Sequence, residues 1–382
     1  MSNPSFALPL ILLGLVTAVP GTAETYDTVE QLGEALFFDT NLSLNRTQSC
    51  ATCHDPQYGF ADPRETRAGR AVSLGDDGES LGDRNAPTAS YAAFTPAFTQ
   101  TESEVWVGGM FHDGREPDLE GQAGGPPLNP IEMGMPDKAS VVERLREDPA
   151  YVAAFTSLWG TGVFEDTDQA YRAMTEAIAA FERTDVFAPF DSKYDRYLRG
   201  EYTLSADEEL GRLLFFSEQF TNCNLCHQLK RSPIDPGETF SNYEYHNIGV
   251  PENLQVRGQN GVAVGHVDGG LFENPLVSDP SRRGQFKVPT LRNVAVTGPY
   301  MHNGVFDDLR TVVLFYNKYN TRSEARQINP ETGATWNAPE YAPTLSVQEL
   351  THGPALDDQR IDALVAFMKT LTDARYEHLL ER

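Results

Sequence analysis

The chain has no cysteine to spare, few positive charges and, beyond its first residues, no long apolar run. All four cysteines lie in two Cys-x-x-Cys-His segments, so none remains for a disulfide framework. Lys and Arg number 30 against 55 Asp and Glu, giving a net charge of -25. Such a surface repels a phosphate backbone, which excludes nucleic acid as a partner. No later stretch approaches the ~20 apolar residues that span a bilayer, so we expect no membrane span.

The N-terminus carries the longest apolar run. It extends from Leu8 to Val19 and is followed by small residues up to Ala23, a pattern that suits cleavage by signal peptidase. We therefore expect residues 1–23 to be a signal peptide and the mature protein to be periplasmic. The alternative is a buried N-terminal helix.

The two Cys-x-x-Cys-His segments predict covalently bound haem. In each, two thiols add to the vinyl groups of a haem while the adjacent imidazole reaches the iron, which makes His54 and His227 the predicted iron ligands. A redox dithiol or a zinc half-site is the alternative. A dithiol does not need the histidine, however, and no second pair completes a tetrahedral site. We therefore predict two c-type haems, attached through Cys50, Cys53, Cys223 and Cys226.

The chain also contains an internal repeat. Residues 32–38 (LGEALFF) and 210–216 (LGRLLFF) are alike, and each precedes one haem segment. Each half then ends in a segment whose apolar residues recur at helical spacing. The residues of these two patterns are Met174, Ile178 and Phe181, then Leu364, Phe367, Met368 and Leu371.

The repeat predicts a mainly α fold of two cytochrome c-like domains, each with one covalent haem. A proline-containing linker at residues 187–193 separates them. We place the N-terminal domain at residues 24–195 and the C-terminal domain at residues 196–382. Long irregular stretches, residues 67–85 and 240–284, are expected to be functional loops over the haems.

The iron face opposite each histidine decides the function. A second strong ligand makes a haem that transfers electrons, whereas an open face makes a reactive one. Periodicity does not select a ligand among the other histidines, each of which is more often structural than ligating. These are His112, His246, His266, His302, His352 and His378.

Several further segments make the chain similar to the bacterial di-haem peroxidase superfamily. Within it, the chain resembles the methylamine-utilisation branch, which matures tryptophan tryptophylquinone in methylamine dehydrogenase. The likeness covers nearly all of the chain after residue 23. The matching segments are residues 48–56, 82–85, 129–133, 190–196, 243–249 and 286–304.

The resemblance implies a tyrosine ligand on the second haem. Ordinary di-haem cytochrome c peroxidases place a methionine in the helix after the Pro-Tyr-x-His segment, and this chain has Tyr316 at that place. A phenolate is a hard anionic donor that stabilises high oxidation states of iron. The alternative is that Tyr316 only packs in the core.

For the first haem the resemblance implies an open iron face. Many peroxidases carry a distal histidine in the loop that corresponds to residues 71–80, which here contains none. Gln122, Pro126 and Glu132 are implied to line this face, with Glu132 moving a proton between the two oxygens of hydrogen peroxide. Without the resemblance, Glu132 would be taken for a solvated surface residue.

A structural calcium ion between the haems is implied as well. Asn85 would supply a side-chain oxygen, and Thr297 and Pro299 backbone oxygens, all hard donors of the kind that calcium prefers. Taken alone, Asn85 would be interpreted as a loop cap.

Two positions depart from the pattern of the branch. Its members have a tryptophan between the haems, where this chain has His112, and a second that relays electron holes to the substrate, where this chain has Thr221. Phe220, the residue before Thr221, falls in a small insertion of this chain relative to the pattern of the branch. Imidazole is harder to oxidise than indole. The tryptophans of this chain match neither position and are expected to pack; they are Trp106, Trp159 and Trp336.

Two functions stay open at this point. One is long-range oxidation of tryptophans in a methylamine dehydrogenase precursor, driven by hydrogen peroxide or by O2 plus electrons. The other is reduction of hydrogen peroxide with electrons from a small redox protein. Tyr316 and the missing distal histidine favour the first, whereas His112 and Thr221 weaken it. A pure electron carrier is disfavoured because it does not need an open iron face.

Overall fold

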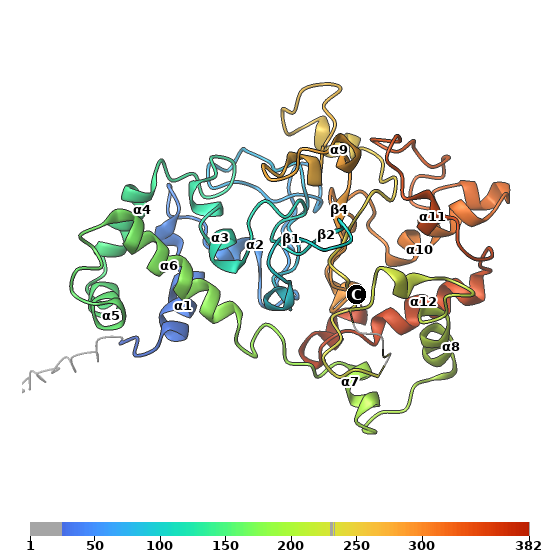
Figure 1. The fold of residues 1–382 in the computed structure, drawn as a ribbon, viewed down its shortest axis with the longest axis horizontal. Helices are drawn as coiled ribbons and strands as arrows, with labels where there is room; N and C mark the ends of the chain where they lie inside the picture. Colours follow the sequence, from blue (N-terminus) through green and yellow to red (C-terminus); the bar gives the residue numbers. More distant parts are fainter. Residues whose placement is uncertain (1–24, 230–231, 233, 382) are drawn as a thin grey trace, which may run out of the picture.

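The structure, a computed structural model, describes residues 25–229, 232 and 234–381. The expected signal peptide, residues 1–23, lies outside them. The described chain is rich in helix and has little sheet, which confirms a mainly α fold. Two groups of helices lie side by side, one from each half of the sequence (Figure 1). No helix of the described residues is long and apolar enough to cross a membrane.

The first half contains helices α1 to α6, and the second half contains α7 to α12. Those of the first half are α1 Val29–Phe38, α2 Cys50–Cys53, α3 Leu119–Ala123, α4 Lys138–Arg146, α5 Pro149–Trp159 and α6 Thr167–Glu182. Those of the second half are α7 Lys193–Leu198, α8 Ala206–Phe215, α9 Leu254–Arg257, α10 Leu309–Asn317, α11 Val347–Leu350 and α12 Asp358–Lys369.

The sheet content of the described residues consists of two short antiparallel pairs. Strand β1 (Thr99–Gln100) pairs with β2 (Trp106–Val107), with Thr99 opposite Val107. Strand β3 (Tyr245–His246) pairs with β4 (Phe286–Lys287), with Tyr245 opposite Lys287. The two stretches expected to be irregular consist mainly of turns, although residues 240–284 also contain α9 and β3.

Each half is built on one pair of packed helices, α1 with α6 and α8 with α12. The contact is closest at the glycine of the repeated Leu-Gly sequence. A Cβ atom on Gly33 would lie 1.9 Å from the carbonyl oxygen of Ala177, and one on Gly211 would lie 1.9 Å from that of Ala363. No side chain fits there, so glycine lets the two backbones touch. The repeat seen in the sequence is therefore a repeated helix crossing.

The helices that begin the two halves also start in the same way. Thr28 caps α1 and forms a capping box with Gln31, while Ser205 caps α8 and forms a capping box with Glu208. In each box the hydroxyl accepts from one backbone N–H and the longer side chain accepts from another. Both helices thus have their first amides satisfied before any tertiary contact is made.

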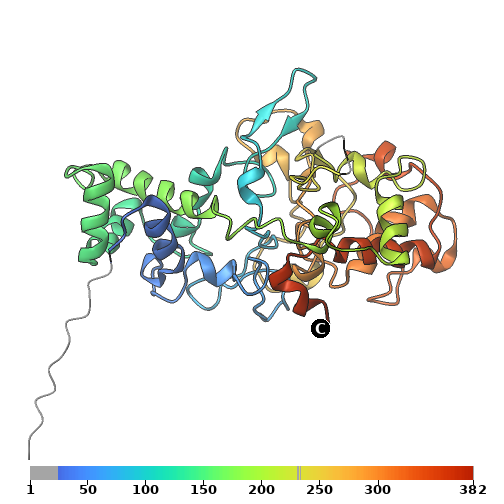
Figure 2. The ribbon, with the colours of Figure 1, turned by 90° about the horizontal axis from the view of Figure 1, so that it is seen from below.

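The chain moves from one hydrophobic core to the other between Phe187 and Tyr194. The apolar residues predicted at helical spacing lie in these cores, on α6 and α12 except for Leu371, which follows the end of α12. Between the cores the chain runs in extended form from α6 to α7 (Figure 2). The predicted domain division at residue 195 lies within α7, whose Tyr194 already packs in the second core.

Polar contacts join the two halves. In the second half, Arg292 is fully buried, and its Nη1 donates to Oδ2 of Asp195 on α7 at 2.6 Å. Its guanidinium also lies 5.2 Å from the ring centre of Tyr91, a residue of the first half. Near the C-terminus, the Tyr376 hydroxyl donates to the backbone oxygen of Pro56 at 2.9 Å. The end of the chain thus packs back against the first half.

Candidate functional site

One cavity, lined by residues of both halves, collects all of the site residues that the sequence predicts. Both Cys-x-x-Cys-His segments open onto it, and none of their four cysteines forms a disulfide. Residues from near both ends of the chain, from Gln48 to Met368, therefore face one continuous space. The predicted site residues in its wall are Cys50, Cys53, His54, Asn85, His112, Gln122, Pro126, Glu132, Cys223, Cys226, His227, Thr297, Pro299 and Tyr316.

The two predicted iron-ligating histidines are held in the same way. Nδ1–H of His54 donates to the backbone oxygen of Phe60 at 3.2 Å, and that of His227 donates to the backbone oxygen of Phe240 at 3.3 Å. Because a carbonyl can only accept, the proton belongs on Nδ1 and the Nε2 lone pair remains for a metal. Phe60 and Phe240 both have left-handed backbone, with φ of 55° and 57°.

A Pro-Thr dipeptide, present in both halves, holds the turns whose carbonyl groups accept from the two histidines. The Thr88 hydroxyl donates to the backbone oxygen of Gly59 at 2.5 Å, and the Thr290 hydroxyl donates to that of Thr239 at 2.7 Å. In both cases the threonine follows a proline that lines the cavity. Sequence reasoning missed this Pro-Thr repeat, although the dipeptide was a visible signal. With paired thiols and an oriented imidazole on one cavity wall, the residues fit a c-type haem in each half.

The residues implied to face the first haem come from a short, irregular part of the chain. Gln122 lies on α3, Pro126 begins a 3-10 helix at Pro126–Leu128, and Glu132 follows it. Oε1 of Glu132 accepts from Nδ2 of Asn129 at 2.9 Å. Burial raises the pKa of Glu132, while Arg115 and Asn129 oppose the shift. A carboxyl with raised proton affinity in such a wall can both accept and return a proton.

Tyr316 lies on α10 in the wall of the cavity, together with His227. Burial raises the pKa of its phenol well above the usual range. A phenolate at this position therefore requires a cation close to the oxygen, which is what a ligated metal ion would supply.

His112 is held as a neutral imidazole. Its Nε2–H donates to the backbone oxygen of Asn85 at 2.9 Å, and its own backbone oxygen accepts from the amide of Lys287 at 2.9 Å. Burial lowers the pKa of His112 to about 4, and the positive charge of Arg84 adds to this effect. The His302 ring lies 6.5 Å away, edge to face. His112 thus contacts the first half through its ring, in one defined tautomer, and the second half through its backbone oxygen.

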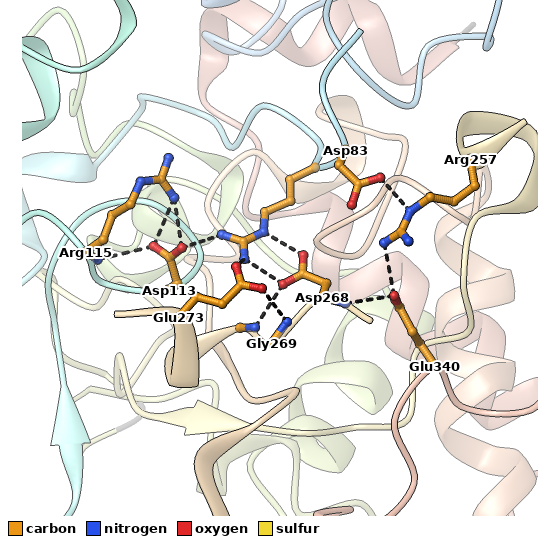
Figure 3. Close-up of polar contacts among 10 residues, drawn as sticks. Asp83, Asp113, Arg115, Arg257, Asp268, Gly269, Glu273 and Glu340 are labelled. Atoms are coloured by element: carbon orange, nitrogen blue, oxygen red, sulfur yellow. Dashed lines mark hydrogen bonds and ion pairs between the residues drawn. The ribbon is translucent and has the colours of Figure 1, made fainter. Parts of the chain in front are cut away.

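Sequence reasoning missed a charged cluster next in sequence to His112, and Figure 3 shows its carboxylates Asp113, Asp268 and Glu273. Its centre is Arg84, which donates to Asp113 at 2.5 Å, to Asp268 at 2.6 Å and to Glu273 at 2.9 Å. Asp113 and Asp268 are almost fully buried. Arg84 therefore joins the turn that carries His112 to a loop of the second half. Its partners are too far apart in sequence for a local motif to reveal them.

The implied calcium ligands also lie in the cavity wall. Nδ2 of Asn85 donates to the backbone oxygen of Ala71 at 2.9 Å, which leaves Oδ1 of this amide available as a ligand. Within the described part of the chain, no three His, Cys, Asp or Glu side chains are grouped to hold a metal ion. A site made of one amide and two backbone oxygens is of another kind, so calcium stays a prediction.

The two positions that depart from the branch also line the cavity, as does Phe220, whose side chain is 40% exposed. The Thr221 hydroxyl donates to the backbone oxygen of Leu214. The expectation that the tryptophans pack is confirmed. Their ring neighbours are Phe98 for Trp106, Phe155 for Trp159, and Phe306 and Phe315 for Trp336.

Comparison with known proteins gives one consistent family. The sequence profile of the di-haem cytochrome c peroxidase family matches residues 27–203. The methylamine utilization protein MauG of Paracoccus denitrificans is 55% identical over 97% of this chain and 96% of its own. The cytochrome c551 peroxidase of Pseudomonas aeruginosa is 32% identical over 74% of this chain and 70% of its own. The crystal structure of the diheme peroxidase BthA from Burkholderia thailandensis superposes with a TM-score of 0.81, at 32% identity, over 93% of this chain and 88% of its own.

Proposed function

The chain belongs to the di-haem cytochrome c peroxidase family, and on that premise we propose that it is a MauG-type di-haem oxidase. Its substrate would be a methylamine dehydrogenase precursor, in which it oxidises tryptophans to form tryptophan tryptophylquinone. Hydrogen peroxide, or O2 plus electrons, is the oxidant. The observation that carries the proposal is that two equivalently held histidines share one cavity with unlike partners, Glu132 from the first half and Tyr316 from the second.

The two haems would be held by the two Cys-x-x-Cys-His segments, one in each cytochrome c-like domain. His54 and His227 would each bind an iron ion through Nε2, because their Nδ1–H groups are already engaged with backbone oxygens. When bound, the haems supply the redox chemistry, storing oxidising equivalents from peroxide for a substrate that does not enter the cavity. The chain itself binds, orients and moves protons.

At the first haem, Glu132 is the proposed acid and base. Its carboxylate would accept a proton from one oxygen of hydrogen peroxide and return it to the other, while the bound haem would supply the redox chemistry of peroxide reduction. The hydrogen bond from Asn129 fixes the carboxyl in the wall. Gln122 and Pro126 line the same cavity and would face the haem held by His54, next to Glu132.

At the second haem, Tyr316 is the proposed sixth ligand. The buried position of its phenol means that ionisation occurs only beside a positive metal centre. The resulting anionic donor would favour high oxidation states of iron, which suits a haem that holds an oxidising equivalent.

His112 is the proposed bridge between the two haem sites. Its Nε2 proton faces a carbonyl oxygen, which cannot take up the proton. The ring therefore orders the space between the sites by hydrogen bonding and is poorly suited to carry a hole. The same Asn85 would use its side-chain oxygen for a calcium ion, with Thr297 and Pro299. Calcium and His112 would then be linked through one residue.

A second candidate function is a di-haem cytochrome c peroxidase that reduces hydrogen peroxide with electrons from a small redox protein. His112 and Thr221, in place of two oxidisable tryptophans, favour it. In both functions a small redox protein would donate electrons, and the protein would work in the periplasm.

The purified protein, given peroxide and a methylamine dehydrogenase precursor, should form the quinone, which is measured by its absorbance. A reduced small cytochrome or copper protein serves as the competing donor. Rapid peroxide turnover on that donor, without quinone, would assign the chain to the second candidate. Electron paramagnetic resonance of the ferric protein should show one high-spin and one low-spin haem, and two low-spin haems would contradict an open peroxide site.

A further inference from the structure

A carboxyl group that the proposed mechanism does not use lies in the wall of the first haem site. Glu182, the last residue of α6, lines the cavity and is only 5% exposed. Its Oε2 is fully buried and has no hydrogen-bond partner within the described residues. One turn earlier on the helix, Ile178 and Ala179 are buried apolar residues. An isolated carboxylate is costly in such a place, whereas a protonated carboxyl costs much less.

The charged groups around Glu182 do not neutralise it. The adjacent Arg183 directs both terminal nitrogens to Glu120, at 2.7 and 2.8 Å, and this pair lies near the surface. Burial raises the pKa of Glu182 to about 8, which Arg183 opposes and the negative charge of Glu120 reinforces. The carboxyl is thus buried, and the residue next to it in sequence belongs to an ion pair that reaches the surface.

Glu182 is also electrostatically close to the predicted haem attachment site. Burial raises the pKa of the Cys50 thiol, and the negative charge of Glu182 adds more to this shift than any other charged group. Cys50 would attach the first haem covalently. In a low-dielectric wall, a charge at the carboxyl and a charge on the haem interact more strongly than they would in water. Adding an electron to this haem therefore favours the neutral, protonated form of a neighbouring carboxyl.

We propose that Glu182 is a redox-linked proton site: its carboxylate takes up one proton when the first haem gains one electron and releases it when the electron leaves. The inference rests on the proposed haem at His54. The step is balanced, since one electron enters the haem, one proton from solvent enters the carboxyl, and the local charge does not change. By linkage, proton affinity and electron affinity must then depend on each other.

The test is the reduction potential of each haem as a function of pH, measured on the full di-haem protein. The wild-type potential of the first haem should fall as pH rises, by up to ~59 mV per pH unit for a one-electron couple. In Glu182→Gln, which keeps the size but cannot ionise, this slope should vanish while the second haem is unchanged. Glu143→Gln, an exposed change on α4, is the matched control and should leave both curves as they are.

A second variant separates a charge effect from a packing effect. Glu120→Gln frees the Arg183 guanidinium, which should stabilise the ionised Glu182 and move the pH-dependent region to lower pH. A slope that persists in Glu182→Gln, or that is unmoved in Glu120→Gln, overturns the inference.

If Glu182→Gln does not fold, infrared difference spectra of the wild type decide the question. Reduction should then increase a protonated-carboxyl band, and an unchanged band would count against Glu182. A chain without haem at Cys50 and Cys53 would instead contradict the proposed function. A chain with that haem but a pH-independent potential would contradict only the present inference.

Discussion

The two halves of the molecule agree on one side of each predicted haem and differ on the other. On the histidine side, both have a glycine-mediated helix crossing and an imidazole donating to a phenylalanine carbonyl. Elsewhere in the cavity wall, the first half presents Glu132 after a 3-10 helix, whereas the second presents Tyr316 from α10. In the proposed function, the duplicated part would hold the haems, and the part that differs would decide what each haem does.

The difference follows from what each wall must supply. Holding an imidazole needs one backbone oxygen in a fixed place, which a turn supported by a threonine hydroxyl provides in both halves. Moving a proton needs an ionisable side chain, and stabilising an oxidised metal needs an anionic ligand. These demands cannot be met by the same residue, so the two opposite walls have different sequences and different secondary structure.

Replacing the acid of the first wall should give the largest effect. Glu132→Gln should slow the reaction with peroxide by about 10²- to 10⁴-fold, the range for losing a general acid–base group, with both haems retained. Because burial raises the pKa of Glu132, the wild-type rate should increase as pH rises through this raised value and be lost below it. Stopped-flow absorbance at several pH values measures both effects.

Glu143→Gln controls for loss of a glutamate and should react like the wild type. If Glu132→Gln keeps both the rate and the pH profile, the first wall has no acid–base role, and the proposed contrast with the second half fails.

The shared scaffold predicts similar damage from equivalent changes in the two halves. Gly33→Ala and Gly211→Ala each place a methyl group against a backbone oxygen of the packed helix. Each should lower the free energy of unfolding by about 1–3 kcal/mol, as overpacking in a core does. Chemical denaturation of the di-haem protein measures the loss. Gly162→Ala, where the added atom would lie 3.7 Å from Glu165 in ordinary contact, controls for the glycine-to-alanine change itself. If only one crossing is sensitive, the halves are not structurally equivalent.

The role of Tyr316 in the second half is tested by replacing this proposed ligand. Tyr316→His should keep both haems but shorten the lifetime of the peroxide-oxidised state by at least about tenfold, which is ~1.4 kcal/mol. A neutral imidazole supplies less negative charge to oxidised iron than a phenolate. The lifetime is read from the decay of the optical spectrum after one equivalent of peroxide. An unchanged spectrum and lifetime would mean that Tyr316 only packs.

The smallest effect is expected at the place where an electron hole would pass from the second half to the substrate protein. We propose that the exit lies near Phe220 and Thr221, and that Thr221→Trp accelerates quinone formation by a factor of a few, on the order of 1 kcal/mol in barrier. An indole there would supply an easily oxidised step between haem and surface. Thr221→Phe is the matched control, because it adds size without an oxidisable ring. Equal rates in both variants would place the exit elsewhere.

The sequence was sufficient for the features that depend on local patterns. Both helix repeats, both Cys-x-x-Cys-His segments and the apolar spacing on α6 and α12 correspond to elements of the structure. The Pro-Thr repeat escaped because the loops between it and the haem segments have different lengths, so no fixed period exists. Arg84 and Glu182 escaped for another reason. An arginine or glutamate is ordinarily a surface residue, and only three-dimensional packing buries these two among distant partners.

The buried Arg292 has a consequence for how the molecule unfolds. Its guanidinium is paired with Asp195 and surrounded by rings from Tyr91, Phe190 and Phe240, which belong to both halves and to the connection between them. Separating the halves would remove the contact between the guanidinium and the Tyr91 ring, a loss of about 2 kcal/mol for a desolvated cation–π pair. The duplicated chain should therefore melt as one cooperative unit, with a single calorimetric transition in place of two.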